Sequence, residues 1–404
     1  MKDPKLSWWN YKATTPKTIT FIVTKDCQLA CKYCYLVAKN TNGRMSLETA
    51  KKTVDYILDN PNFFNEKSVS FDFIGGEPFL EIDLIDAICD YIKIELYKRN
   101  HPWFNKYTFS FSTNGINYNN EKVQNFIKKN IKHLIIGITI DGTKNKHDLN
   151  RIYKNSGKGS YDDVVANIPL WLKQFPQANT KVTLSSEDLP YVCESVLHLF
   201  QLGIHYVFMN CVFEDVWKDG DDVVLEEQLI KLADAIIDNE LYVNNSCSIF
   251  DEKIGKHNID NKNWCGSGKM MAIDCDGNFY PCNRFVDFSL RDKKPRIIGN
   301  INTGIDPNKV KPFLLLDLKT QSSEKCLNCE VSKGCAWCQG ENYDSAETDT
   351  VYKRSTAICL MHKARVRANN YYWNKLYMHI QKSGKKNSIS DNNNDTTVFS
   401  QNAC

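Results

Sequence analysis

The fold of this chain is constrained most by six short apolar patterns typical of β-strands, each separated from the next by a region long enough for a helix. All six lie in the first half, up to about Asp215, and they read TITFIVT, SVSFDFI, YTFSFS, HLIIGITI, TKVTLSS and IHYVFMNC. Strands joined by helical crossovers run parallel to one another. We therefore predict an α/β fold in which six such units close into an open, partial (β/α)6 barrel similar to a TIM barrel.

The first predicted crossover helix has a recognisable start and one apolar face. It occupies the run SLETAKKTVDYILDN, in which Ser46 can cap the first turn. Ala50, Val54, Ile57 and Leu58 recur at the helical period and form its apolar stripe.

Barrels of this kind place their chemistry at the carboxyl ends of the strands. Each of the first four predicted strands runs into an unusual motif: TKDCQLACKYCYL at 24–36, GGEP at 75–78, STNG at 112–115 and DG at 141–142. Three further polar residues follow the last motif: His147, Asp148 and Arg151. All of these motifs are expected to share one rim of the barrel.

The composition of the chain indicates its size class, its expected partners and its compartment. The chain has 404 residues, of which 42% are apolar, so it can form one large core or two domains. A net charge of +3 without a basic stripe makes nucleic acid an unexpected partner. The first residues lack an apolar signal region and no run is long enough to span a membrane, so we expect no membrane association and a cytoplasmic protein. Sixteen cysteines in a reducing compartment indicate metal rather than disulfides.

The first cysteine cluster is an incomplete ligand set. Cys27, Cys31 and Cys34 lie within eight residues. Three thiolates leave one iron of a four-iron cluster without a protein ligand, and that iron can bind a substrate. Taken alone, the three cysteines also fit part of a zinc site.

The C-x3-C-x2-C spacing, with an aromatic residue before the third cysteine and GGEP further on, resembles the radical S-adenosylmethionine (SAM) enzymes. The resemblance implies that Cys27, Cys31 and Cys34 hold a [4Fe-4S] cluster whose free iron binds SAM. One electron then cleaves SAM to methionine and a 5′-deoxyadenosyl radical, which abstracts hydrogen from the substrate.

The resemblance also suggests residues that contact SAM. The GGEP segment, with Glu77 as acceptor, would hold the methionine amine, and its glycines would let the backbone approach the ligand. Arg151 offers a planar fork for the methionine carboxylate, although a surface salt bridge is an alternative role. The full set of expected SAM-binding residues is Tyr33, Gly75, Gly76, Glu77, Pro78, Ser112, Asn114, Thr139, Arg151 and Ser185.

The last third of the chain contains a second cysteine pattern. It consists of WCGSG, DCDGNFYPC and CLNCEVSKGCAWC, followed by one more cysteine. This pattern resembles the SPASM extension of radical SAM enzymes, with one residue fewer than usual between the last two cysteines of the run. Taken alone, it would also fit a zinc ribbon.

The SPASM resemblance implies two auxiliary [4Fe-4S] clusters, and thus three in the whole chain. Aux II would be held by Cys326, Cys329, Cys335 and Cys359, and Aux I by Cys265, Cys282 and Cys338. Aux I is then one thiolate short. Cys275 could fill the vacancy, but its place at the entrance to a hairpin turn favours an open site. Four scattered cysteines are interpreted as small buried hydrophobes: Cys89, Cys193, Cys211 and Cys247.

We therefore predict four regions: an N-terminal extension (1–17), the radical SAM partial barrel (18–235), a Cys-rich SPASM domain (236–380) and a flexible tail (381–404). The tail is rich in Asn, Ser and Asp, a composition that does not order itself.

SPASM enzymes that resemble this chain are mainly peptide maturases and anaerobic sulfatase maturases. Sulfatase maturases usually carry an aspartate base directly after the YPC cysteine, but here that residue is Asn283, whose amide cannot take a proton. CGSG, YPCNRFV and an open Aux I instead resemble the maturases that form thioethers in CXXX-repeat (ranthipeptide) precursors. Sulfatase maturation and carbon-carbon cross-linking are the alternatives within this class.

The expected partners follow from the same resemblance. They are a Cys-rich precursor peptide and a reductant of the flavodoxin or ferredoxin type. The residues before the first strand are too few for the winged-helix module that some relatives use, so the leader peptide must be recognised elsewhere. An iron-sulfur electron carrier with a degenerate barrel is a hypothesis of another class, which anaerobic SAM cleavage would exclude.

Overall fold

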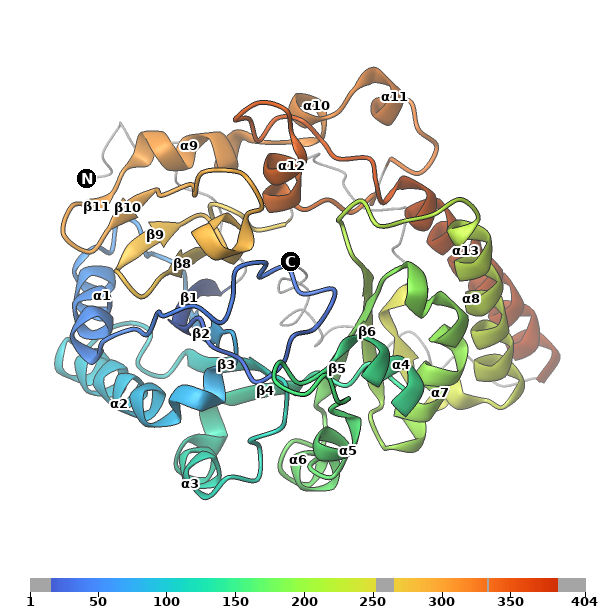
Figure 1. Ribbon diagram of the computed structural model, residues 1–404, viewed down its shortest axis with the longest axis horizontal. Coiled ribbons are helices and arrows are strands. Elements are labelled where there is room, and N and C mark those ends of the chain that lie inside the picture. The colour runs from blue at the N-terminus through green and yellow to red at the C-terminus, as the bar shows by residue number, and fades with distance from the viewer. Residues whose placement is uncertain (1–15, 252–264, 333, 384–404) are drawn as a thin grey trace.

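Parallel strands that alternate with helices form the first half of the protein, as Figure 1 shows. The computed structural model describes residues 16–251, 265–332 and 334–383. Four parallel strands stand side by side in the order of the chain: β1 (Lys17–Thr24), β2 (Val69–Gly75), β3 (Tyr107–Thr113) and β4 (Leu134–Ile138). Two more, β5 (Asn179–Leu184) and β6 (Tyr206–Cys211), are parallel to each other. All six predicted strands are confirmed.

Helices connect these strands, as the pattern predicts. They are α1 (Leu47–Asp59), α2 (Ile82–Lys98), α3 (Glu121–Asn130), α4 (Lys144–Asn150), α5 (Tyr161–Val165), α6 (Ile168–Gln174) and α7 (Val192–Gln201), with α8 (Asp221–Asp238) after β6. The Ser46 side chain accepts a bond from Thr49 N, and the four predicted stripe residues of α1 are buried. The cap and the apolar face of this helix are therefore confirmed.

The strand series is interrupted between β4 and β5. The first four strands belong to an eight-stranded sheet, whereas β5 and β6 form a separate three-stranded sheet with β7 (Ser246–Cys247). The hydroxyl of Thr180 donates to Ile138 O at 2.8 Å and accepts from Ile140 N at 3.0 Å. A side chain thus joins the two sheets where a backbone ladder would otherwise run, and the six strands form two sheets rather than one continuous barrel wall.

One face of the parallel sheet is packed with phenylalanine. Phe21 and Phe73 stack with ring centroids 5.6 Å apart, and Phe73 stacks on Phe111 at 5.3 Å. These side chains are fully or almost fully buried. The opposite face carries Thr20, Asp72 and Ser110, also buried but polar. This alternation fixes the register, because a slip of one residue would exchange the two faces.

The last third of the chain continues the same sheet. Strand β8 (Met271–Ile273) pairs parallel with β1, and β9 (Asn278–Tyr280), β10 (Gly299–Asn300) and β11 (Gly304–Ile305) extend it by antiparallel pairing. Helices α9 (Pro307–Leu315), α10 (Leu318–Gln321), α11 (Glu324–Leu327) and α12 (Gln339–Ser345) follow. The long α13 (Cys359–Ser383) returns to pack along α8 (Figure 1). The Cys-rich region is therefore built directly onto the edge of the barrel sheet.

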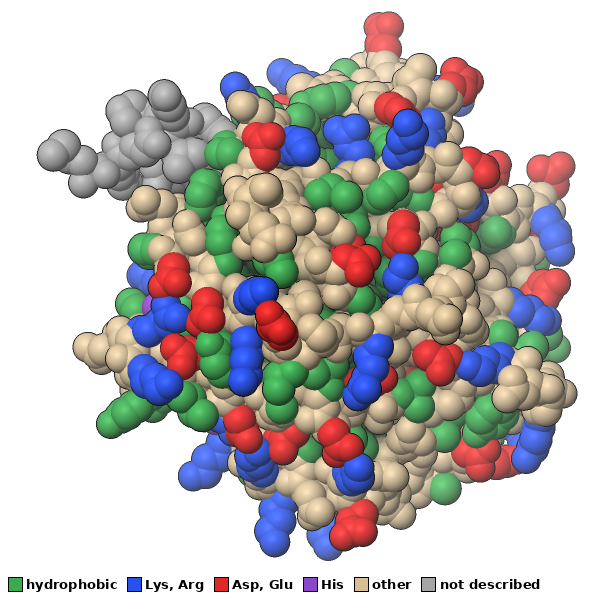
Figure 2. Space-filling model, turned by 60° about the vertical axis from the view of Figure 1, so that its left-hand side comes forward, with side chains coloured by type: hydrophobic (Ala, Val, Ile, Leu, Met, Phe, Trp, Pro, Cys, Tyr) green, Lys and Arg blue, Asp and Glu red, His purple; other side chains and the backbone are tan. Residues whose placement is uncertain are grey.

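Two of the four predicted regions lie wholly or mainly outside the described residues, namely the N-terminal extension and the tail. No described helix is long and apolar enough to cross a membrane. On the face shown in Figure 2, the described Lys and Arg side chains are interspersed with Asp and Glu.

Candidate active site at the carboxyl ends of the strands

The three-cysteine loop follows β1 and is pinned to the segment after α4. Ala30 N donates to Ile152 O at 2.8 Å, and Lys32 N donates to Asn150 O at 3.1 Å. Within the loop, Cys34 N donates to Cys31 O at 3.1 Å, and the Cys27 sulfur accepts from Leu29 N at 3.3 Å. Burial raises the pKa of Cys27 to about 11. An anion at this sulfur therefore needs a compensating charge, which a bound metal supplies.

The glycines of GGEP pack closely against the cysteine loop. A Cβ on Gly76 would lie 2.1 Å from Asp26 O and 2.9 Å from Cys27 N, and one on Gly75 would lie 2.4 Å from Thr24 O. Gly76 N and Glu77 N donate to Thr24 O and Asp26 O. The glycines thus let β2 approach the cysteine loop, so the close approach is to this chain's own backbone.

Glu77 is a structural acceptor in this arrangement. It is fully buried, and its carboxylate accepts from Thr113 Oγ1 at 2.6 Å, Asn114 N at 2.7 Å and Phe79 N at 3.0 Å. Pro78 is buried at the first position of a short 3-10 helix (Pro78–Glu81). Three hydrogen bonds within the protein therefore occupy the Glu77 carboxylate. Only its remaining lone pairs are left to accept from the amine of SAM.

Four other residues of the expected SAM-binding set separate into two groups. Thr139 lines a cavity beside the cysteine loop, and Ser112 is exposed at the end of β3. Asn114 is buried and donates to Gln28 Oε1 at 3.0 Å, while the Ser185 hydroxyl donates to Asp188 at 2.7 Å in a capping box. Asn114 and Ser185 are thus engaged in local structure, and Thr139 and Ser112 are more accessible to a ligand.

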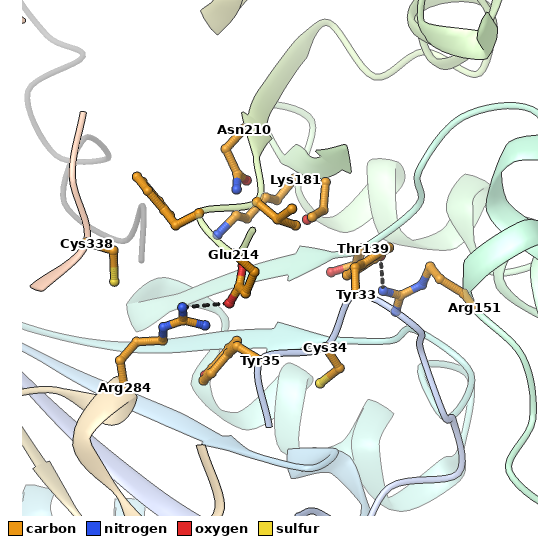
Figure 3. Close-up of a pocket in the computed structure, with 13 residues that line it drawn as sticks. Tyr33, Cys34, Tyr35, Thr139, Arg151, Lys181, Asn210, Glu214, Arg284 and Cys338 are labelled. Atoms are coloured by element: carbon orange, nitrogen blue, oxygen red, sulfur yellow. Dashed lines mark hydrogen bonds and ion pairs between the residues drawn. The ribbon is translucent and has the colours of Figure 1, made fainter. Parts of the chain in front are cut away.

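Tyr33 joins two charged residues at the centre of the rim. Its hydroxyl donates to Asp141 Oδ2. The same hydroxyl accepts from Arg151 Nη1 at 2.8 Å, as Figure 3 shows. Although burial raises it, the nearby charges of Lys146 and Arg151 hold the pKa of the Asp141 carboxyl below its usual value. The buried Arg151 Nε has no hydrogen-bond partner among the described residues. Arg151 is thus a buried cation with an unused donor, which suits a carboxylate ligand and excludes the surface role.

This geometry predicts that Tyr33→Phe weakens SAM binding. Loss of the hydroxyl frees the Arg151 guanidinium from Asp141, and one such hydrogen bond corresponds to about a tenfold change in affinity. We expect the KM for SAM to rise about tenfold in an assay of 5′-deoxyadenosine release, with a smaller change in kcat. Tyr153→Phe is the matched control, because its hydroxyl donates to Asp163 at 2.7 Å on the surface. An unchanged KM for Tyr33→Phe would show that the Tyr33 hydroxyl does not contribute to SAM binding.

A cavity of about 170 Å³ connects this rim to the Cys-rich region. Cys34, Tyr33 and Arg151 line one end, and Cys338 and Arg284 line the other, as Figure 3 shows. The walls between them come from the residue after β4, from β5 and β6, and from the residues after β6. A substrate in this cavity would touch both cysteine regions at once.

Four C-terminal cysteines gather as the proposed Aux II set. Burial and the neighbouring Cys359, Cys329 and Cys326 thiols raise the pKa of Cys335 to about 11. Arg354 donates to Cys335 O at 3.0 Å, so a cation lies beside the group. The segments around α11 and the start of α13 thereby bring together thiols from two parts of the chain.

The proposed Aux I cysteines lie on the cavity side. Burial, followed by the Cys338 thiol, raises the pKa of Cys282 to about 12, and the Ser267 side chain bonds to Cys282. Gly268 N donates to Pro281 O at 2.9 Å, which holds the segment containing Cys265 beside Cys282. Cys275 points elsewhere: its sulfur donates to Ile22 O on β1 at 3.4 Å. The geometry thus brings together two of the thiols and places the third nearby, with Cys275 turned to the sheet.

The described thiols do not form a site for a single metal ion. Among residues 16–251, 265–332 and 334–383, no three His, Cys, Asp or Glu side chains lie close enough together to hold one metal ion. A cluster differs from zinc in this respect, because its thiolates bind separate irons. Of the scattered cysteines, Cys89, Cys211 and Cys247 are buried and Cys193 is partly buried, as expected for apolar packing.

Comparison with known proteins identifies the first half of the chain. Residues 21–184 match the family model described as Radical SAM superfamily. The chain carries a radical SAM domain. The protein is therefore an enzyme, and the cofactors of its radical SAM domain are SAM and an iron-sulfur cluster.

Relatives extend this radical SAM similarity over most of the chain. A cysteine-type anaerobic sulfatase-maturating enzyme of Clostridium novyi is 24% identical over 361 residues, which cover 82% of this chain and 91% of that enzyme. The antilisterial bacteriocin subtilosin biosynthesis protein AlbA of Bacillus subtilis is 28% identical over 281 residues, which cover 68% of this chain and 57% of AlbA.

Solved structures show the same fold. Native anSMEcpe with bound AdoMet aligns with a TM-score of 0.69 and 21% identity, covering 92% of this chain and 100% of that one. Streptococcus suis SuiB bound to precursor peptide SuiA aligns with a TM-score of 0.59 and 15% identity, covering 88% and 78%. The predicted fold, a radical SAM barrel with a SPASM-type extension, is thereby confirmed.

Sequence reasoning missed three residues of the site. Asp141 was noted only as part of a strand-end DG motif, and neither Glu214 nor Arg284 was singled out. Glu214 follows the end of β6, and that strand-end position is the one sequence signal that could have found it. Arg284 lies 70 residues away along the chain and meets Glu214 only in the folded protein.

Proposed function

We propose that this radical SAM enzyme forms Cys thioether bonds, from sulfur to carbon, in a ribosomally synthesised peptide. The observation that carries the proposal is the cavity between Cys34 and Cys338. It joins the radical-generating centre to an auxiliary centre for which only three thiols are assigned. Cys265, Cys282 and Cys338 would hold that centre, which when bound would offer a free position for the substrate thiolate and so orient its sulfur for bond formation.

Action on a peptide or protein is supported by the relatives. Two of the similar proteins are a sulfatase-maturating enzyme and AlbA of subtilosin biosynthesis. SuiB, which has the same fold, is seen bound to a precursor peptide. These similarities support the class of enzyme and leave the bond to be decided by the residues of the cavity.

Two residues favour a thioether over formylglycine. Asn283 stands where sulfatase maturases have an aspartate base, and its amide donates to the Tyr35 hydroxyl at 2.5 Å. The Cys275 sulfur bonds to the backbone of β1, which is consistent with an Aux I centre that lacks a fourth thiolate. Formylglycine formation remains the second candidate, because sulfatase-maturating enzymes are similar over most of the chain.

In this proposal, the residues at the rim and in the cavity have separate roles. Cys27, Cys31 and Cys34 hold the first cluster, which when bound supplies the electron for reductive cleavage of SAM. Arg151, fixed by Tyr33, holds the methionine carboxylate, and Thr139 and Ser112 lie within reach of the rest of the cofactor. Apolar Val212 and Phe213 line the cavity and help to exclude water from the reacting groups.

The auxiliary centres belong to the proposal as well. Cys265, Cys282 and Cys338 hold Aux I at the cavity, and Cys326, Cys329, Cys335 and Cys359 hold Aux II further out. Full occupancy gives about twelve iron and twelve sulfide per chain. The SPASM domain spans 236–380 in this account, and its first strands share a sheet with the barrel. The proposed electron donor is a flavodoxin or a ferredoxin.

The proposal predicts a specific change in the peptide. Incubating the reduced enzyme with SAM and a synthetic Cys-rich CXXX-repeat peptide should lower the peptide mass by about two hydrogens for each bond. Each modified cysteine should no longer react with iodoacetamide, and Cys→Ser in the peptide should prevent its modification.

Two other results would contradict thioether formation and indicate a different product. A thiol that still alkylates after turnover would indicate a carbon-carbon cross-link or another oxidation. Release of hydrogen sulfide with an aldehyde product would establish formylglycine formation instead.

A further inference from the structure

One acidic side chain faces the cavity between the two cysteine regions. Glu214 follows β6, and of the described residues that line the cavity it alone carries a carboxylate. Tyr35, Arg284 and Cys338 line the same part. Figure 3 shows the carboxylate directed toward the Arg284 guanidinium, with Cys34 on one side and Cys338 on the other. Glu214 therefore stands between the place where the radical forms and the proposed auxiliary centre.

An arginine fixes the position of Glu214. Arg284 Nη2 donates to Glu214 Oε1 at 2.7 Å and to Glu341 Oε2 at 3.3 Å, and its guanidinium lies 4.9 Å above the Tyr35 ring. Arg284 is buried, whereas the Glu214 side chain is 24% exposed. Bonds among the described residues use only the Oε1 oxygen of Glu214. Its other oxygen is thus left for a ligand in the cavity.

The proposed reaction needs a proton acceptor at this place. Thioether formation removes a hydrogen atom from carbon, a proton from the thiol and one electron, while the sulfur-carbon bond forms. SAM, when bound and cleaved, would supply the radical that takes the hydrogen atom, and a cluster held by the proposed auxiliary thiols would take the electron. The proton remains, and a side chain at the substrate must accept it.

The other polar groups of the cavity are poor acceptors. Arg151, Lys181 and Arg284 are cationic side chains, and Asn210 carries an amide. Asn283 is also an amide and is bonded to Tyr35. A carboxylate can take the proton, and Glu214 is the one that the described cavity wall offers.

We propose that Glu214 is the general base that accepts the substrate proton, with Arg284 as the positioning residue that directs its carboxylate. This inference rests on the proposed peptide oxidation, but it holds for any product that requires loss of a proton together with a hydrogen atom. In this proposal the base is Glu214, after the end of β6. Sulfatase maturases instead have their base at the position of Asn283, directly after the YPC cysteine.

The test compares modified peptide with 5′-deoxyadenosine in the same sample. Glu214→Gln keeps the size of the side chain and a bond to Arg284 but cannot accept the proton. We expect modified peptide per 5′-deoxyadenosine to fall about a hundredfold, the usual contribution of a general base. The remaining rate should rise steadily with pH as hydroxide replaces the base, and Glu214→Asp should recover part of the activity.

Two matched variants separate catalysis from structure. Glu226 is 25% exposed and pairs with Arg367 at 2.6 Å on the surface, so Glu226→Gln controls for loss of a Glu-Arg pair. Glu341→Gln removes the other carboxylate partner of Arg284 without changing the cavity wall. Both should keep the wild-type ratio within about threefold, and iron content should report that every variant folds.

The proposal is overturned if Glu214→Gln keeps a ratio within about threefold of wild type. It is equally overturned if Glu341→Gln lowers the ratio as far, because Glu214 then acts only by holding Arg284. Failure of the thioether proposal looks different: wild-type product would retain an alkylatable thiol or carry an aldehyde. In that case the ratio still measures the role of Glu214 in forming that product.

Discussion

Cys31→Ala will abolish reductive cleavage of SAM. Cys31 lies in the loop after β1, and its neighbours include the Arg151 guanidinium and the Cys34 thiol. Removing one of the three proposed thiolate ligands would leave the first cluster with two, so the chain could neither hold it nor offer an open iron to SAM. We expect 5′-deoxyadenosine to fall below detection under dithionite reduction, together with the loss of about four iron per chain.

Cys193→Ala is the matched control for Cys31→Ala. Cys193 is a partly buried cysteine near the start of α7, and it belongs to neither proposed set of cluster ligands. Its replacement should leave iron content and 5′-deoxyadenosine release at the wild-type level. Normal release of 5′-deoxyadenosine by Cys31→Ala would show that the three-cysteine loop is not the site of SAM cleavage.

Gly76→Ala will have nearly as large an effect, although it removes no ligand. The added methyl group would lie 2.1 Å from Asp26 O and 2.9 Å from Cys27 N, both of them backbone atoms. The loop that carries Cys27 must move, because two paired backbone segments offer no flexible side chain to give way. We expect loss of about four iron per chain and at least about a hundredfold slower SAM cleavage.

Gly157→Ala separates this clash from a general effect of replacing glycine. A Cβ at Gly157 meets nothing within 4 Å, but its φ of +68° is left-handed, so alanine there costs about 1–2 kcal/mol of folding free energy. This variant should lose some thermal stability yet keep its iron and its activity. A fully loaded and active Gly76→Ala would mean that the close contact between β2 and the cysteine loop is not required.

The fold was predictable where the signal is local. The six strands and the cap at Ser46 follow from side-chain period and capping chemistry, which act within a few residues. At the break between β4 and β5, the Thr180 hydroxyl donates to carbonyls about forty residues away in the chain. Such a long-range contact leaves no trace in the pattern of either strand.

In the site, too, local features were predictable from the sequence and long-range contacts were not. Spacing and resemblance indicated Cys27, Cys31 and Cys34 as one group, and the structure holds them in a single loop. The close packing of the GGEP glycines against Asp26 was not predictable, because the sequence does not show that β2 passes so near the cysteine loop. The pairing of Glu214 with Arg284 was equally hidden, because the cavity wall is assembled from distant segments.

The most direct test of the central claim follows a hydrogen atom from peptide to cofactor. A Cys-rich peptide with deuterium on the carbons of its non-cysteine residues is incubated with reduced enzyme and SAM, and both products are analysed by mass spectrometry. The account predicts one deuterium in 5′-deoxyadenosine for each sulfur-carbon bond, and a peptide that has lost that deuterium together with its thiol proton. If 5′-deoxyadenosine forms without deuterium while the peptide thiols still alkylate, then the radical does not act on a carbon that sulfur attacks, and thioether formation is contradicted.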